Sequence, residues 1–445
     1  MSKINKVLSS IKLTENGDIA FSSTGNNLLD LLFLSEYFTK HPEHANIGTS
    51  EREKLFSMFM RDPRYGMGRR DLGRELMKLS GVKPENVVKA GRFDDLMYSC
   101  TREDAFAYLK KEIDLGNELA KKWAPRYSSK DLMLARDFAK YLGMNKQQYG
   151  KYVKARTVER CLSSKNTGII DFEHVPSLAM IKYYTRFSTK DDTAKRFAKY
   201  LDDVKSGKAE LKISTTSVYD IYRNCGKIDA DLFFDKIEKI SINCIPVVDT
   251  SGSMFDDNDS IGKALALGHY FGTCSTYMKD CAVTFSSRPS VRYFYDDPSF
   301  VSMSFEEYAK ERTPIFWDSS NYAKQVRSMI TGDYSNTDFG AVMELLSKFG
   351  NLPEYIIVLS DMEFDSGSRM TKDDVKRLWE EKGYSTKIVW WNLNGRSKTC
   401  PEIDDEGNIF MSGYNPMLLK FIEAGFDGDK FLNKLLDEYE RAISK

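Results

Sequence analysis

The hydrophobic pattern of the chain changes near residue 240, and this change limits the folds that the chain can adopt. Before it, apolar residues recur three and four positions apart, which is typical of amphipathic helices. After it, short continuous apolar runs alternate with helical segments. Such runs predict strands of a parallel sheet that is covered on both faces. A chain of 445 residues is also long enough for two cores. We therefore expect a multidomain protein of the α plus α/β class.

In the first half, helix is expected to follow helix, with short loops and no convincing pair of strands. The expected helices span residues 28–38, 52–62, 70–80, 102–123, 130–144, 176–187 and 193–207. This order predicts an all-helical HEAT-like solenoid or ring. No clean fixed-period repeat is present, so the prediction rests on the succession of helices and not on self-similarity.

In the second half, strands and helices are expected to alternate. The expected strands span residues 241–249, 280–287, 354–361 and 385–393, and the expected helices span 260–278, 339–350, 371–383 and 415–425. This alternation predicts a doubly wound, Rossmann-like α/β domain. The predicted boundaries are 1–215 for the helical domain, 216–239 for an extended connector and 240–445 for the α/β domain.

One loop of the second half carries a set of oxygen side chains. In VVDTSGSM (247–254), an apolar strand ends at Asp249, and Ser251 and Ser253 follow. Asp361 ends a second expected strand, and ligands of such sheets bind beyond the carboxyl ends of the strands. Carboxylate and hydroxyl oxygens suit Mg²⁺ or another divalent cation such as Mn²⁺. Thr337, just before an expected helix, offers one more hydroxyl.

This pattern of residues resembles the metal-ion-dependent adhesion site (MIDAS) of von Willebrand factor A domains. The D-x-S-x-S motif, the loop threonine and the later aspartate correspond to Asp249, Ser251, Ser253, Thr337 and Asp361. The resemblance covers residues of about 240–445, and the Ser335–Asn336 pair departs from the glycines that many members have beside the threonine. It implies a bound Mg²⁺ whose open position accepts a carboxylate from a partner protein. The alternative is a polar loop without a metal.

The layout of helices followed by an A domain resembles the Ro ribonucleoproteins, whose helical part is called TROVE. It resembles more closely a broad uncharacterised family with the same layout. The segments that carry this closer resemblance are TGNNLLDLLF (24–33), FMRDPRYGMGRRDL (59–72), GRFDDLMY (91–98), KKWAPR (121–126), EHVPSLAM (173–180), SDMEFD (360–365) and MSGYNPMLLKFIEA (411–424). The Ro resemblance implies binding of small structured or misfolded RNA on the helical part.

Charge is divided unevenly between the two halves. Residues 1–212 carry 39 Lys and Arg against 28 Asp and Glu, whereas residues 213–445 carry 26 against 37. Basic side chains neutralise phosphates, and nearby aromatic rings can stack on bases. The candidate RNA-binding residues are Arg61, Arg64, Arg69, Arg70, Lys121, Lys122, Arg126, Lys151, Lys154 and Arg156. Three alternatives remain open: electrostatic docking of the two halves, solvated basic faces, and buried pairs that involve Arg61 or Arg92.

The remaining features bound the class of protein. The seven cysteines are scattered without a CxxC pair, and no apolar run is long enough for a signal peptide or a membrane span. We therefore expect a cytoplasmic protein without disulfides. No P-loop, GxSxG or HExxH motif is present, and His269 is expected mid-helix in a structural role, so we expect no enzymatic activity.

Three functions follow from these patterns. The first is a non-enzymatic RNA-binding scaffold whose metal site recruits a protein partner. The second is a protein–protein adaptor or assembly component without RNA. A metal-dependent hydrolase ranks last, because it needs a second metal or a positioned base. The acidic run Asp256–Asp259 is either a further cation site or a solvated turn, and Trp123 is either a stacking platform or part of the core.

Overall fold

The N-terminal part of the protein is helical in the computed structural model. The structure describes residues 26–444 except 34, 41, 129, 156–157, 164–166, 190, 214–215, 286–287, 296–317, 331–337, 362–376, 378, 380, 382, 395–401, 404–407, 413–420, 423–424 and 426. The α-helices of this part are α2 (Asn27–Phe33), α3 (Ser35–Lys40), α4 (Glu51–Arg61), α5 (Arg70–Ser80), α6 (Pro84–Ala90), α7 (Leu96–Ser99), α8 (Arg102–Asp114), α9 (Glu118–Trp123), α10 (Leu132–Tyr141), α11 (Lys146–Tyr152), α12 (Val158–Ser163), α13 (Ser177–Thr189) and α14 (Asp191–Lys205). Short 3-10 helices are η1 (Pro42–His44), η2 (Phe93–Asp95), η3 (Thr167–Ile169) and η4 (Phe172–His174).

Local sequence signals set the ends of these helices. Ser50 and Glu53 form a capping box at the start of α4, and Gly81 ends α5 in the left-handed region with φ of 70°. The prediction of a single helix over 102–123 is wrong, because α8 ends at Asp114 and α9 begins at Glu118. Gly116, with φ of 86°, turns the chain between them, and the Asn117 side chain then caps α9.

The C-terminal part contains one seven-stranded sheet in the order β3-β2-β1-β4-β5-β7-β6. Its strands are β1 (Cys244–Asp249), β2 (Cys281–Phe285), β3 (Ser290–Tyr293), β4 (Tyr355–Ser360), β5 (Lys387–Asn392), β6 (Glu402–Ile403) and β7 (Ile409–Ser412). The five central strands, β2, β1, β4, β5 and β7, pair in parallel. The edge strands β3 and β6 pair antiparallel with their neighbours. The four predicted strands are thus confirmed, whereas the short strands β3, β6 and β7 were not predicted.

Helices cover both faces of this sheet. The helices of this part are α17 (Ser260–Cys274), α19 (Asn321–Arg327), α20 (Phe339–Leu346), α23 (Gly428–Ser444) and the 3-10 helix η5 (Gly252–Met254). Val248 and Leu359 lie in the same core cluster as α17, while Val247 and Val358 pack with Val342 of α20 on the opposite face. Alternate residues of each buried strand therefore point to different layers. The α plus α/β prediction is confirmed. Most of the helices expected over 371–383 and 415–425 lie outside the described residues.

The segment between the two parts is helical, which corrects the extended connector expected there. It forms α15 (Val218–Arg223) and α16 (Ala230–Lys236). Ser217 and Asp220 build a capping box at the start of α15, and Asp229 caps α16. These side chains accept hydrogen bonds from N–H groups at the start of two short helices. The apolar faces of both helices are buried, and this packing stabilises them although the hydrophobic periodicity of the segment is weak.

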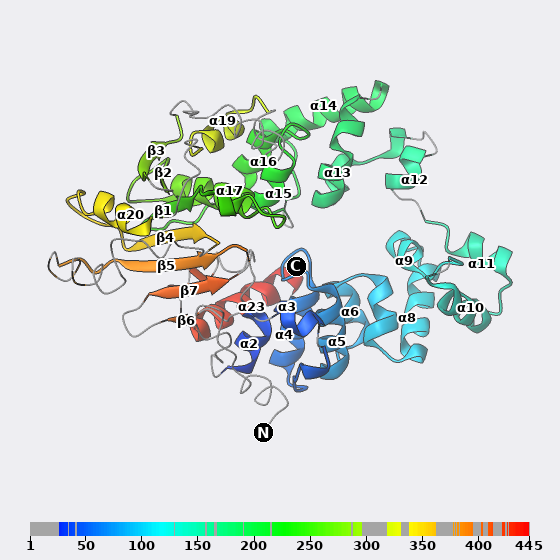
Figure 1. The fold of residues 1–445 in the computed structure, drawn as a ribbon. Helices are drawn as coiled ribbons and strands as arrows, with labels where there is room; N and C mark the ends of the chain where they lie inside the picture. The colour runs from blue at the N-terminus through cyan, green and yellow to red at the C-terminus, as the bar shows by residue number, and fades with distance from the viewer. Residues whose placement is uncertain are drawn as a thin grey trace.

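The helical part contacts the sheet part at both of its ends. Figure 1 shows the helices as an arc that runs from α2 through α8 and α11 to α14. At its far end, α15 and α16 pack on α17 and α19. At its near end, α23 packs on α4, with the rings of Phe59 and Tyr439 edge to face at 5.5 Å. The Tyr439 hydroxyl also donates a hydrogen bond of 3.3 Å to the Asp62 carboxylate. Within the described ranges, no helix is long and apolar enough to cross a membrane.

Gly73 is a point of close approach between α5 and α4, and its substitution tests this packing. A Cβ there would lie 2.6 Å from the Cα of Arg61, so Gly73→Ala must separate the two helices. We expect a loss of about 1–3 kcal/mol in the free energy of unfolding, measured by urea denaturation with circular dichroism. Gly150→Ala in α11 is the control, because its Cβ meets no atom within 4 Å. An equal effect of both substitutions would contradict the close contact.

Candidate functional site

The candidate metal site lies where β1 and β4 end side by side. These strands run in parallel, with Val248 opposite Leu359, so their carboxyl ends reach the same edge of the sheet. β2 lies on the other side of β1, so the strand order reverses at this pair. Such a switch point is the usual ligand site of a doubly wound sheet. Asp249 ends β1, and Ser360 and Asp361 stand at the end of β4.

Hydrogen bonds hold the Asp249 carboxylate in a fixed orientation. Asp249 is fully buried; its Oδ2 accepts a bond of 2.6 Å from the Ser360 hydroxyl, and its Oδ1 accepts one of 2.9 Å from the Ser251 N–H. The Ser251 side chain is buried as well, and its hydroxyl lies 3.2 Å from that of Ser253. Ser253 belongs to η5 and is exposed. The loop thus presents two hydroxyls beside a fixed carboxylate.

The environment of Asp249 disfavours its negative charge. Burial and, less strongly, the nearby Asp361 carboxylate raise the pKa of this carboxyl to about 6, although the hydrogen bonds from Ser360 and Ser251 oppose the shift. Asp361 is itself only 4 % exposed. Two buried carboxylates close together are costly unless a cation compensates them. The donor set of carboxylate and hydroxyl oxygens therefore fits a hard divalent cation.

Four of the five predicted ligands are described, and the structure brings Asp249, Ser251, Ser253 and Asp361 to one edge of the sheet. Thr337 lies outside the described residues. Ser360 was not singled out from the sequence, although it directly precedes Asp361 at a strand end. In the part of the chain that the structure describes, no group of three His, Cys, Asp or Glu side chains could hold a metal. The candidate site contains two carboxylates, and its other donors are hydroxyls.

The acidic run that follows the site serves a helix. The Asp256 carboxylate accepts hydrogen bonds from the N–H and hydroxyl of Ser260, at 2.9 and 3.0 Å. The Asp259 carboxylate accepts bonds from the N–H of Gly262 and from the Tyr219 hydroxyl. Both residues thus stabilise the N-terminus of α17, where negative charge is favourable. This use gives no support to a second cation site in the run.

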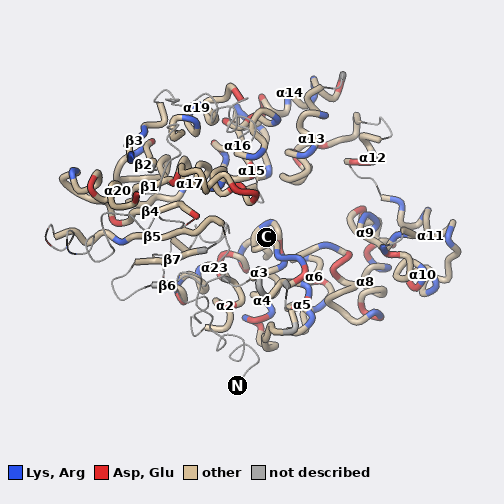
Figure 2. Tube along the Cα trace, viewed as in Figure 1, with Lys and Arg blue, Asp and Glu red and all other residues tan. Residues whose placement is uncertain are grey.

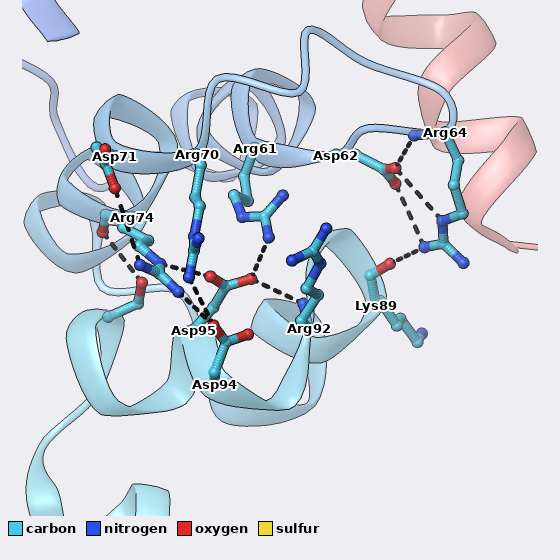
Figure 3. Close-up of polar contacts among 11 residues, drawn as sticks. Arg61, Asp62, Arg64, Arg70, Asp71, Arg74, Lys89, Arg92, Asp94 and Asp95 are labelled. Atoms are coloured by element: carbon cyan, nitrogen blue, oxygen red, sulfur yellow. Dashed lines mark hydrogen bonds and ion pairs between the residues drawn. The ribbon is translucent and has the colours of Figure 1, made fainter. Parts of the chain in front are cut away.

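The arginines of segment 61–74 enter a network of ion pairs, which Figure 3 shows. Arg61 is only 2 % exposed and lies 2.7 Å from Asp95, whose carboxylate is fully buried. Arg74 pairs with both Asp94 and Asp95, and Arg70 pairs with Asp94. Arg61 therefore does not face an RNA at the surface, which corrects its assignment as an RNA contact. Its partner is Asp95 and not the neighbouring Asp62.

The other candidate RNA-binding residues differ in exposure. Arg64 is half exposed and bonds to Asp62 and to the Lys89 carbonyl, and Arg69 is partly buried. Lys121 pairs with Glu118, and Arg126 donates to the carbonyls of Lys121 and Lys122. Lys151 and Lys154 are exposed, and Arg156 lies outside the described residues. Figure 2 shows that basic residues recur along α9, α10 and α11.

Trp123 ends α9 and is partly buried against the main core, as expected for a core residue. The guanidinium of Arg92 lies over its ring, 4.4 Å from the centroid, and the ammonium of Lys122 lies 5.4 Å from it. Trp123 thus makes cation–π contacts with Arg92 and Lys122 and also packs against the core.

Two family models match parts of the chain. Residues 243–441 match a domain of unknown function, DUF7788, and residues 112–219 match another, DUF2828. No curated protein matches the chain. Among solved structures, the chain is similar to the crystal structure of Deinococcus radiodurans RO (RSR) protein, with 8 % identity and a TM-score of 0.34, over 98 % of this chain and 99 % of that chain. At this TM-score, the similarity carries no argument about RNA or metal binding.

The raised pKa of Asp249 predicts a pH dependence of stability when a chelator removes divalent cations. The folded state keeps a proton on Asp249 up to about pH 6, whereas the unfolded chain releases it near the ordinary aspartate pKa of 3.8. The folded state therefore binds more protons between these values, and the free energy of unfolding falls as pH rises through this window. Asp249→Asn should remove the fall and stabilise the protein at pH 7 by about 2–3 kcal/mol, measured by denaturation.

Asp257→Asn is the matched control for that experiment, because Asp257 is an exposed carboxylate in the same loop. It should leave the pH profile unchanged. A lower stability of Asp249→Asn at pH 7 in chelator would show that the buried carboxylate is compensated without a cation.

Proposed function

We propose that this protein is a non-enzymatic scaffold that holds a protein partner through a Mg²⁺-dependent adhesion site and binds RNA on its helical part. The observation that carries the proposal is the pair of buried carboxylates, Asp249 and Asp361, with serine hydroxyls at the switch point of the sheet. The von Willebrand factor A character of the domain belongs to the same proposal.

Asp249, Ser251, Ser253 and Asp361 would hold the ion, together with Thr337. A bound Mg²⁺, or another divalent cation such as Mn²⁺, supplies an open position that accepts a carboxylate oxygen. The side chains of the protein orient the donors: Ser360 and the Ser251 N–H fix Asp249, and η5 turns the chain so that Ser253 reaches the surface. The partner is therefore a protein that offers an Asp or Glu side chain.

A binding role agrees with the chemistry around the site. His269, the histidine of the sheet part, is fully buried among the rings of Phe234, Phe294 and Tyr322. Burial lowers its pKa to about 4, so it stays neutral in the fold at neutral pH. It does not reach the solvent at the edge where Asp249 lies, and it offers no general base to a substrate there.

The RNA part of the proposal rests on the basic residues of α9, of α11 and of the turn that follows α11. Lys151 and Lys154 are exposed, and Tyr152 between them is partly buried with its hydroxyl on Asp114. Lys122 is partly exposed beside Trp123. Lysines spaced along a helical surface neutralise phosphates without reading sequence, which suits structured RNA recognised by shape.

The second candidate function is a protein–protein adaptor without RNA binding. The ion pairs of Arg61 and Arg74 favour it, because these two arginines are buried and stabilise the fold instead of forming a free basic surface. The two candidates differ in salt dependence, since phosphate contacts make log affinity fall steeply with log salt concentration.

Magnesium should raise the melting temperature of the wild type and of Asp257→Asn, and it should not raise that of Asp249→Asn. Binding to the folded state alone stabilises it by about 2.7 kcal/mol at 100 times the dissociation constant. Differential scanning calorimetry in a Mg²⁺ series measures the effect. An undiminished shift in Asp249→Asn would remove the metal assignment.

Charge reversal at Lys151 and Lys154 tests the RNA surface. We expect Lys151→Glu/Lys154→Glu to weaken binding of a structured RNA about tenfold or more and to reduce the slope of log affinity against log salt by about 1–2. Fluorescence anisotropy across a salt series measures both quantities. Lys279→Glu/Lys348→Glu is the matched control, because these lysines are exposed on the sheet part. Absence of RNA binding by the wild type would favour the adaptor.

A further inference from the structure

The ion-pair network at the junction of α4, α5 and η2 contains more positive than negative charge. Four guanidinium groups meet there, from Arg61, Arg70, Arg74 and Arg92, and Figure 3 shows them around the carboxylates of Asp94 and Asp95. Asp71 approaches Arg74 only at 3.8 Å and is largely exposed. With Asp71 counted, four arginines face three carboxylates, so the network carries an excess of one positive charge.

Three of the four oxygens of the two carboxylates are engaged, whereas Oδ1 of Asp94 is buried and accepts no hydrogen bond from any described residue. Asp95 accepts bonds from Arg74 Nε at 2.5 Å and from the Arg92 backbone N–H at 2.7 Å, and it lies 2.7 Å from Arg61. One oxygen of Asp94 contacts both Arg70 and Arg74 at 2.8 Å. The Nε groups of Arg61 and Arg70 are buried and donate no hydrogen bond to any described residue. Donors remain that the chain does not use.

The guanidinium of Arg92 has no carboxylate partner among the described residues and lies beside other cations. Figure 3 shows it turned toward the guanidinium of Arg61. Burial lowers the pKa of Arg92, and the charges of Arg61 and Arg70 lower it further, against the weaker pull of Asp94 and Asp95. The guanidinium plane of Arg92 lies over the Trp123 ring. Such a placement is unfavourable unless an anion joins the group.

We propose that Arg92, together with Arg70, binds a phosphate group, while the buried Arg61 adds positive charge beneath the site without contacting the ligand. A guanidinium offers paired N–H donors that match two phosphate oxygens, and neighbouring guanidinium groups neutralise the negative charge of the phosphate. Arg92 is partly exposed and the Arg70 side chain is 41 % exposed, whereas Arg61 is buried behind them. Arg92 and Arg70 are therefore the members of this group that solvent reaches. Trp123 holds Arg92 in place.

This site is separate from the metal site, and it does not require the proposed RNA function. The chemistry that it recognises, a phosphate group with at least two free oxygens, occurs both in free phosphate monoesters and in the backbone of RNA. Inorganic phosphate is thus the first probe, and RNA is a competitor that identifies the source.

The first experiment compares thermal unfolding of the full chain in inorganic phosphate with unfolding in NaCl of equal ionic strength. We expect phosphate at about ten times its dissociation constant to raise the melting temperature of the wild type by roughly 1–3 °C. Arg92→Gln should lose this shift and bind phosphate at least tenfold more weakly in calorimetric titration. Without phosphate it should melt no lower than the wild type, because removal of Arg92 relieves repulsion from Arg61 and Arg70.

Arg102→Gln is the control, because Arg102 is an exposed arginine of α8 that pairs with Asp137 outside the network. It should keep the phosphate shift. Arg92→Lys should recover part of it, since an ammonium keeps the charge and loses the paired donors. An equal phosphate shift in the wild type and Arg92→Gln would overturn the proposal, and so would the absence of any shift in the wild type.

The second experiment assigns the source of the group. If a short single-stranded RNA displaces phosphate from the wild type, and Arg92→Gln binds that RNA more weakly, the site holds an RNA phosphate. If phosphate binds and RNA does not displace it, the site holds a free phosphate monoester. RNA binding that depends on Lys151 and Lys154 but not on Arg92, in a protein without a phosphate shift, would overturn this site and leave the proposed function intact.

Discussion

The parallel pairing of β1 with β4 is the constraint on which the candidate metal site depends. It runs from Cys244 opposite Tyr355 to Val248 opposite Leu359, and both strands are buried throughout. Because the pairing has this register, the hydroxyl of Ser360 meets the carboxylate of Asp249. A slip of one residue would turn Ser360 toward the other face and exchange the two sets of apolar side chains between the layers of α17 and α20. The core and the site are therefore fixed by the same ladder of hydrogen bonds.

A different constraint organises the helical part. There, buried ion pairs connect helices and fix their relative orientation, which apolar packing alone does not specify. Arg74 links α5 to η2 through Asp94 and Asp95, and Arg61 links α4 to the same carboxylate of Asp95. A buried charge without its partner is strongly destabilising, so these contacts specify one arrangement of the helices. Basic composition in a helical sequence is thus a poor guide to surface charge, and the residues that remain exposed on α11 are the better indicator of a ligand.

Much of the fold follows from the sequence, for reasons that can be named. The 3.6-residue spacing of apolar residues located α5 and α10, and continuous apolar runs located β1, β4 and β5. The strands β3, β6 and β7 have four residues or fewer, too few to show a period, and their pairing depends on neighbours far along the chain. The motif residues of the candidate site were found because a strand end and a polar loop are adjacent in sequence. The role of Ser360 was not, because its partner Asp249 lies 111 residues away. The burial of Arg61 depends likewise on Asp95, which no local pattern connects to it.

The packing of α23 on α4 has a consequence for the order in which the protein can form. The Tyr439 hydroxyl bonds to Asp62 across 377 residues of sequence. At about 5–20 residues per second of synthesis, roughly 20–75 s separate the appearance of these two residues at the ribosome. During that time the side of α4 that α23 covers in Figure 1 has no native partner. The ring of Phe59, which meets Tyr439 edge to face in the finished fold, lacks this aromatic partner until the last helix has been made.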